Sequence, residues 1–199
     1  MNASVRAYHL IMTAYGFWLP NEPRGSWSDV VRSWELLKFG AATKVDTTRS
    51  VARKPYDRAL RRRMVKALVR EPVEFTGLQA RAIARGFADY CDRSGCIVYA
   101  CSILPRHVHM VVARHTCSIE QVARLLKGAA TRRLILEGLH PFADEAYSNG
   151  NLPTPWTRHA WAPFLWNDDD VVRAIRYAQN NPTKKGRKVQ RWQFVTAYV

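Results

Sequence analysis

The most constraining feature of this sequence is a short apolar run, residues 104–113, that carries two histidines. The run has the sequence LPRHVHMVVA, and its β-branched and apolar side chains after Pro105 predict a β-strand. Because side chains alternate between the two faces of a strand, His107 and His109 share one face, about 6–7 Å apart along it. Two such imidazoles form half of a metal site, although two partly buried structural histidines would give the same pattern.

The charge of the chain points to a polyanionic partner. Lysine and arginine number 31 against 16 aspartate and glutamate residues, which gives a formal net charge of +15. Such an excess favours nucleic acid or an anionic membrane. The sequence has no apolar run of the length of a signal peptide core or a membrane span, so we expect nucleic acid as the partner and no membrane.

The cysteines indicate a reducing compartment. Cys91, Cys96, Cys101 and Cys117 form no Cys-x-x-Cys pair, which excludes zinc-ribbon spacing. We therefore expect free thiols and a cytoplasmic protein that associates with the nucleoid when it binds DNA.

Hydrophobic periodicity and turn residues predict one α+β domain over residues 1–199. The predicted strands cover residues 6–13, 96–104, 104–113 and a short edge segment at 160–166; the predicted helices cover 57–70, 76–93, 118–137 and 167–181. This order favours a ferredoxin-like or RRM-like antiparallel sheet with helices packed on one face. Its core would comprise residues 5–16 and 76–186, with an expanded segment at 17–75 and a basic tail at 187–199.

The last predicted helix presents a polar row beside its apolar stripe. At about 100° per residue, Val171, Ile175 and Ala178 fall within one arc and form the core stripe. Arg173, Tyr177 and Asn181 follow one another at intervals of four and lie together on another side. Taken alone, they could equally be a surface arginine, a boundary tyrosine and an asparagine that ends the helix before Pro182.

The two elements together resemble the HUH single-tyrosine transposases, which are the transposases of the smallest bacterial insertion sequences and their REP-associated relatives. The family's His-hydrophobic-His motif matches His107-Val108-His109 after Pro105-Arg106. Its Tyr-x-x-x-Asn-Pro-x-x-x-Gly segment matches residues 177–186, and residues 8–16 look like its first strand. The resemblance spans roughly residues 8–186, with an expanded segment after the first strand.

The resemblance implies a mechanism. His107 and His109, with Asn181 as a third ligand, would hold Mg²⁺ or Mn²⁺, and Tyr177 would attack a phosphodiester of single-stranded DNA that carries hairpins at the element ends. The product would be a 5′-phosphotyrosine link with a free 3′-OH, which later reverses the step on another end. Because the tyrosine helix can be donated across a dimer in that family, the sequence allows both a monomer and a homodimer.

Basic side chains would bind the DNA phosphates, and we therefore expect salt-dependent binding. A solvated charged surface is the competing interpretation for any one of them. The candidates are Arg58, Arg61, Arg62, Lys127, Arg173, Lys184, Lys185 and Arg187.

Three other interpretations use the same residues. A histidine-triad nucleotide hydrolase also has alternating strand histidines, but the third alternate position here is Val111. A two-histidine phosphodiesterase needs a second His-x-Thr/Ser repeat, which the sequence lacks. The remaining alternative is a non-catalytic or domesticated protein of the same fold that binds hairpin DNA.

Overall fold

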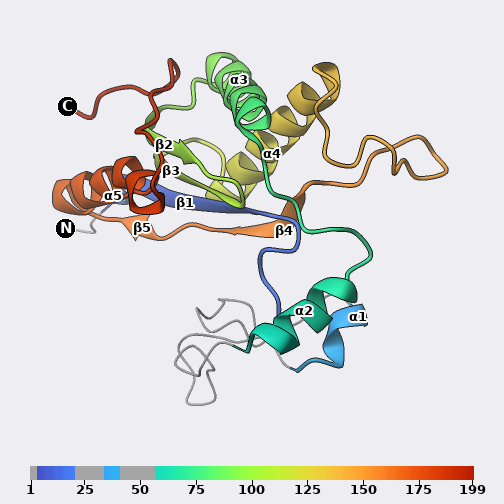
Figure 1. The fold of residues 1–199 in the computed structure, drawn as a ribbon. Helices are drawn as coiled ribbons and strands as arrows, with labels where there is room; N and C mark the ends of the chain where they lie inside the picture. The colour runs from blue at the N-terminus through green and yellow to red at the C-terminus, as the bar shows by residue number, and fades with distance from the viewer. Residues whose placement is uncertain (1–3, 21–33, 41–56) are drawn as a thin grey trace. The chain divides into compact units, whose positions relative to one another are not determined.

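The structure is a computed structural model that describes residues 4–20, 34–40 and 57–199. The chain divides into two compact units (Figure 1). The first comprises Met1–Ala14 and Glu74–Val199, and the second comprises Tyr15–Val73. The second unit occupies nearly the same stretch as the expanded segment that the sequence sets apart from the core.

The first unit is built on one antiparallel sheet of five strands within the described residues. The strands are β1 (Ala7–Ala14), β2 (Val98–Ile103), β3 (His107–Ala113), β4 (Trp156–Trp161) and β5 (Phe164–Leu165). Their spatial order is β2-β3-β1-β4. Strand β5 pairs with the beginning of β1, and β4 pairs with the later residues of β1. Helices α3 and α4 join β1 to β2 and β3 to β4, which is the β-α-β-β-α-β connectivity of the ferredoxin-like class, so the predicted fold class is confirmed.

The long helices begin and end where the local sequence predicts. Thr76, Ser118 and Asn167 each accept a hydrogen bond from a backbone N–H of the first turn, and they cap α3 (Gly77–Ser94), α4 (Ile119–Leu136) and α5 (Asp168–Asn180). Gly95 ends α3 with a φ of 68°, a left-handed conformation that glycine adopts without strain. None of the described helices is long and apolar enough to cross a membrane.

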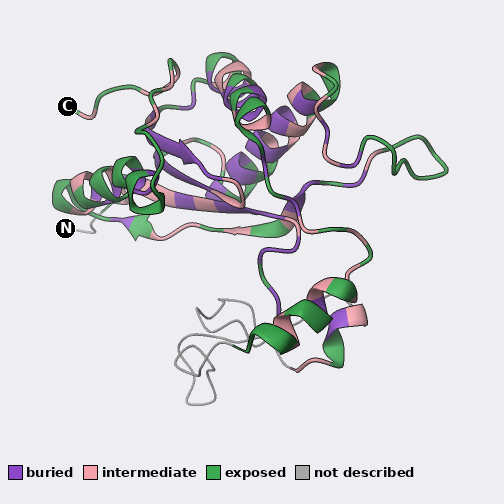
Figure 2. Ribbon diagram, viewed as in Figure 1, coloured by how far each residue is buried: buried purple, intermediate pink, exposed green. Residues whose placement is uncertain are grey.

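The helices use both faces of the sheet. Ala7, Ala100 and Val111 point to one face and pack against Val171 and Ala178 of α5. The alternate residues, among them the fully buried Leu10, Met12 and Met110, point to the other face, where α3 and α4 pack against each other and against the sheet. The expectation that all helices share one face therefore holds for α3 and α4, while α5 takes the opposite face (Figures 1 and 2).

Three local predictions differ from the structure. Strand β4 begins at Trp156, before the edge segment predicted at 160–166, and Pro163 separates it from the two-residue β5. Leu78, an apolar residue of the helix predicted over residues 76–93, is 62% exposed in the first turn of α3 and does not join the core.

The third difference is the C-terminal segment, which covers the edge of the sheet. The side-chain amide of Gln190 donates to the Ile103 carbonyl at 2.8 Å and accepts from the Ile103 N–H at 2.7 Å. Val195 then pairs in parallel with Val98, and the Tyr198 hydroxyl donates to Asp168 at 2.5 Å. Residues 190–198 therefore close the open side of β2 and return to the start of α5.

The second unit has its own small apolar cluster. In the described residues, Leu19, Leu36 and Met64 are buried together between α1 (Trp34–Leu37) and α2 (Arg58–Lys66). Asp57, the first residue of the helix predicted over 57–70, caps α2 by accepting a hydrogen bond from the Leu60 N–H. The Val73 N–H donates to the Tyr15 carbonyl at 3.0 Å, so the two ends of the unit lie side by side, the arrangement with which domains tolerate an inserted segment.

Gly86 allows α3 and α4 to approach closely, and replacing it should be costly. A Cβ at Gly86 would lie 2.7 Å from the Ala129 carbonyl oxygen and 2.7 Å from the Ala130 Cα, both backbone atoms of α4. We expect Gly86→Ala to lower the free energy of unfolding by about 1–3 kcal/mol, measured by urea denaturation. Gly77→Ala, at a position with no atom within 4 Å, is the matched control and should leave stability unchanged or slightly higher; equal losses would contradict this packing.

Candidate active site

Helix α5 places one tyrosine at the surface beside the sheet. The buried side of α5 consists of Val171, Ala174 and Ala178, which pack on the sheet. Tyr177 lies off that side and is 45% exposed, as the helical wheel predicts. Its hydroxyl group is thus carried on a helix that is fixed by its own core, and a large substrate can reach it.

The histidine pair lies beneath this tyrosine. His107 and His109 share one face of β3, with ring centroids 4.9 Å apart. The Tyr177 ring lies edge-on to His109 at 5.2 Å between centroids. Strand β3 and helix α5 are far apart in the sequence, so the fold brings together the two motifs that the sequence singles out.

A third histidine, which lies outside both sequence motifs, completes the cluster. His9 on β1 lies with its Nε2 3.1 Å from Nδ1 of His109, and its ring centroid is 5.5 Å from that of Tyr177. Strand β1 is the neighbour of β3, with Ile11 opposite His109, so His9 is diagonal to His109 on the same face. Identifying His9 from the sequence would require the order of the strands and the register of β1 against β3. The sequence pattern alone provides neither the order nor the register.

Burial keeps these imidazoles neutral. Burial, followed by the nearby His107 and His9, lowers the pKa of His109 to about 2. Burial also lowers the pKa of His9 to about 4. Both rings are therefore uncharged at neutral pH, which is the protonation state that binds metal ions.

The donor set fits a divalent ion without an acidic ligand. No group of three or more His, Cys, Asp or Glu side chains among the described residues is arranged as a metal site. However, the hydroxyl of Ser102, directly opposite His109 on β2, is buried and has no hydrogen-bond partner in the described part of the chain. A buried polar group without a partner, next to neutral imidazoles, is compatible with a hydrated ion at this position.

Asn181 is less exposed than the helical wheel suggests. It is 5% exposed and follows the last residue of α5, with its N–H 3.4 Å from the Ala178 carbonyl oxygen. It lies one helical turn beyond Tyr177, on the same side of the helix. Its role as third ligand stays a prediction.

Several predicted DNA-binding residues surround the tyrosine. The Lys184 ammonium lies 4.9 Å from the centroid of the Tyr177 ring, and Lys185 and Arg187 are exposed just beyond it. Arg173 is exposed and forms an ion pair with Asp170 one turn earlier. Arg58, Arg61 and Arg62 belong to α2, in the second unit of the chain.

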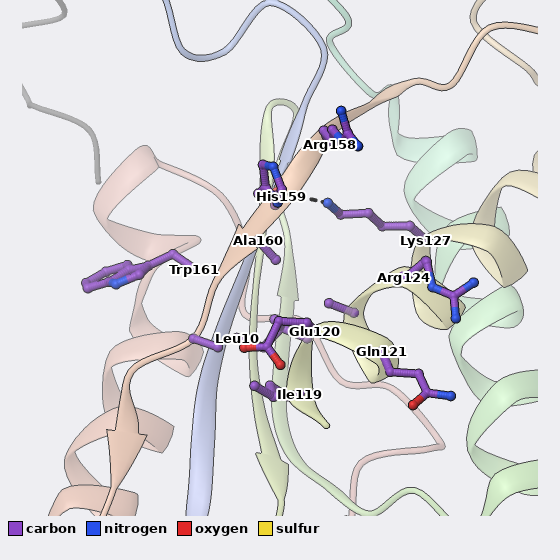
Figure 3. A pocket seen from close by; sticks show the side chains of 12 residues that line it. Leu10, Ile119, Glu120, Gln121, Arg124, Lys127, Arg158, His159, Ala160 and Trp161 are labelled. Carbon is purple, nitrogen blue, oxygen red and sulfur yellow. Dashed lines mark hydrogen bonds between the residues drawn. The ribbon is translucent and has the colours of Figure 1, made fainter. Parts of the chain in front are cut away.

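Lys127 has a different environment from the other predicted DNA-binding residues. It is 8% exposed, and its ammonium group donates to the carbonyls of Thr157 and His159 at 2.8 and 3.0 Å. These contacts tie the outer edge of β4 to α4 (Figure 3). Burial lowers the pKa of Lys127 to about 8.

A groove of about 760 Å³ lies next to this contact, on the α4 face of the sheet. Its apolar wall includes Leu10 and Ile119, and Arg124 and Arg158 stand at its rim (Figure 3). Trp161 points from β4 away from these arginines (Figure 3). The register places Trp161 opposite Ile11, so its side chain belongs to the face of the sheet that carries the histidines.

The chain was compared with protein families, curated proteins and solved structures. No protein-family model matches the sequence, and no curated protein does. The structure is similar to that of a REP-associated tyrosine transposase bound to a REP hairpin, with a TM-score of 0.47 and 12% sequence identity. The match covers 94% of this chain and 72% of the other.

The environment of Lys127 predicts a structural role. We expect Lys127→Met to lower the free energy of unfolding by about 1.5–3 kcal/mol, because two hydrogen bonds from a charged donor are lost, and urea denaturation would measure the change. Arg124→Met, one turn earlier on α4 and exposed, is the control and should change stability by less than about 0.5 kcal/mol. Unchanged stability with a loss of DNA affinity in Lys127→Met would instead favour a direct phosphate contact.

Proposed function

We propose that this protein is an HUH-type single-tyrosine transposase, a metal-dependent enzyme that cleaves and rejoins single-stranded DNA. The observation that carries the proposal is the 5.2 Å contact between the rings of Tyr177 and His109, each of which lies in the motif expected for its role. Neither the histidine pair nor the tyrosine segment would be specific alone. A DNA-nicking site requires the histidines and the tyrosine to lie close together on one face of the sheet. Two unrelated motifs would not be expected to do so.

Tyr177 is the nucleophile in this proposal. Its phenolic oxygen forms a bond to the scissile phosphorus, and the bond from this phosphorus to the 3′ oxygen breaks. The phenol loses its proton, and the departing 3′ oxygen gains one. The products are a 5′-phosphotyrosine and a free 3′-OH. One phosphodiester replaces another, so the reverse attack by a 3′-OH rejoins DNA without ATP.

The proposed metal ligands are His107, His109 and Asn181, with Mg²⁺ or Mn²⁺ as the ion. Such an ion would polarise the phosphate and offset the charge that develops on it during attack. The neutral state of His109 supports the assignment, because a protonated imidazole has no lone pair to give. Asn181 directly follows the helix that carries Tyr177, so this helix and its C-cap would orient both the nucleophile and a ligand.

The basic residues beyond the tyrosine are proposed to bind the DNA strand at its phosphates. Lys184, Lys185 and Arg187 are exposed within ten residues of Tyr177, in and after the 3-10 helix η1 (Thr183–Lys185). Arg173, Arg58, Arg61 and Arg62 are the remaining candidates for phosphate contacts. We propose single-stranded DNA with hairpins at the element ends as the substrate.

Covalent capture tests the nucleophile directly. We expect the wild-type protein, incubated with Mn²⁺ and labelled single-stranded hairpin oligonucleotides from its own genomic flanks, to form a protein–DNA adduct that survives denaturing electrophoresis. Tyr177→Phe should abolish the adduct while DNA binding, measured by fluorescence anisotropy, persists. His107→Ala should also reduce it by at least about 100-fold, since it removes a proposed metal ligand.

Tyr147→Phe is the matched control, because Tyr147 is another exposed tyrosine, in the loop before β4, and it should leave the adduct unchanged. An adduct that survives Tyr177→Phe would eliminate Tyr177 as the nucleophile. Binding without any adduct, across metals and flanking sequences, would favour the non-catalytic hairpin-binding alternative.

Salt dependence tests the phosphate contacts. We expect the logarithm of the DNA-binding constant to fall linearly with the logarithm of the salt concentration. The double variant Lys185→Ala/Arg187→Ala should reduce the steepness of that line by about 1.4, because each lost contact with a single strand is worth about 0.7. An unchanged slope would show that these side chains remain solvated in the complex.

A further inference from the structure

His9 has no assigned role, yet it makes the closest contact in the cluster. Its Nε2 lies 3.1 Å from Nδ1 of His109, a hydrogen-bond distance between two ring nitrogens. A hydrogen bond between two ring nitrogens needs one N–H and one free lone pair, so one ring donates the proton of this bond and the other accepts it. Two arrangements are therefore available. They differ in whether Nε2 of His109 carries a proton or a free lone pair.

The choice between them decides whether His109 can bind a metal. If Nε2–H of His9 donates, Nδ1 of His109 is the acceptor and its own proton sits on Nε2, where it blocks coordination. If Nδ1–H of His109 donates, its Nε2 keeps a free lone pair. Metal-ligating histidines commonly donate their other N–H to a fixed acceptor in this way.

We propose that His9 is a positioning residue that accepts the hydrogen bond from Nδ1–H of His109 and so holds His109 in its metal-binding tautomer. His9 acts through His109 and is not itself a ligand. The inference rests on the proposed function only in taking His109 as a ligand. Its position supports the role, because β1 is the central neighbour of β3 and holds His9 rigidly on the same face of the sheet.

Metal binding in the absence of DNA provides a readout that does not depend on catalysis. We use Co²⁺ as the probe, because imidazoles bind it more tightly than Mn²⁺ and its visible absorption reports ligation. We expect His9→Leu, in the full chain, to weaken Co²⁺ binding by about 10- to 100-fold, the usual effect of losing an outer-sphere partner. His9→Gln should recover most of the affinity, because its amide oxygen can accept the same hydrogen bond.

His140→Gln is the matched control, since His140 is another buried histidine and accepts a hydrogen bond from the Phe142 N–H far from this cluster in the sequence. It should leave Co²⁺ affinity unchanged. Circular dichroism would establish that each variant is folded.

The tautomer itself can be read from the wild-type protein, which removes any dependence on the folding of variants. Long-range ¹H–¹⁵N correlation spectra, with His109 assigned from the spectrum of His109→Gln, should show the proton on Nδ1 and the lone pair on Nε2. A proton on Nε2 of His109 would overturn the proposal. Unchanged Co²⁺ affinity in His9→Leu would also overturn it, as would an absence of Co²⁺ binding to the wild type.

A loss in His9→Gln as large as that in His9→Leu would mean that His9 coordinates the ion directly, and it too would overturn the positioning role. The outcomes separate this inference from the proposed function. A His9 effect on Co²⁺ affinity without any DNA adduct would leave the inference intact and remove the transposase. An adduct that depends on Tyr177, together with a Co²⁺ affinity that is unchanged in His9→Leu, would support the proposed function and overturn the inference about His9.

Discussion

The packing of α5 against the sheet is the contact on which the site depends. The interface is made largely of small residues, with Ala174 and Ala178 of the helix facing Ala7 and Ala100 of the strands. Small side chains let a helix backbone come close to a sheet. That closeness, with Val171 buried in the same cluster, accompanies a distance of 5.2 Å between the ring centroids of Tyr177 and His109. A shift of one residue along the helix would turn the tyrosine by about 100° and separate the two motifs.

The C-terminal segment reinforces this packing from outside. Tyr198 contacts the α5 cluster, lies edge-on to Tyr99 of β2 at 4.8 Å and reaches Asp168 in the first turn of α5. Gln190 holds the same segment on the edge of β2 through both backbone groups of Ile103. The tyrosine helix is thereby anchored to the sheet of its own chain at its start, and Tyr177 meets histidines of the same chain. The segment that the sequence suggested as a basic tail is thus a structural strap after its first few residues.

Local signals in the sequence predict the elements well, and long-range pairing explains what they miss. The caps Thr76, Ser118 and Asn167 mark helix starts because their side chains compete for the first free N–H groups, a purely local effect. Likewise, the alternation of His107 and His109 needs only strand geometry. His9 and Ser102 enter the site through the register of β1 and β2 against β3, which no local pattern encodes. The burial of Asn181 and Lys127 depends in the same way on the surrounding fold, including the carbonyls of β4 that engage Lys127.

The proposed function has a consequence for how metal and DNA bind. His107, His109 and Asn181 would supply a neutral set of ligands, so an ion held by them would keep its full charge. The chain already has a net charge of +15, and the Lys184 ammonium lies next to Tyr177. In the proposed mechanism, the scissile phosphate would supply negative charge to such an ion when the DNA binds. By thermodynamic reciprocity, bound DNA would then raise the affinity for the ion by the same factor by which the ion would raise the affinity for DNA. A buried, neutral His109 suits this arrangement, because its ring adds no positive charge to the site before the DNA binds.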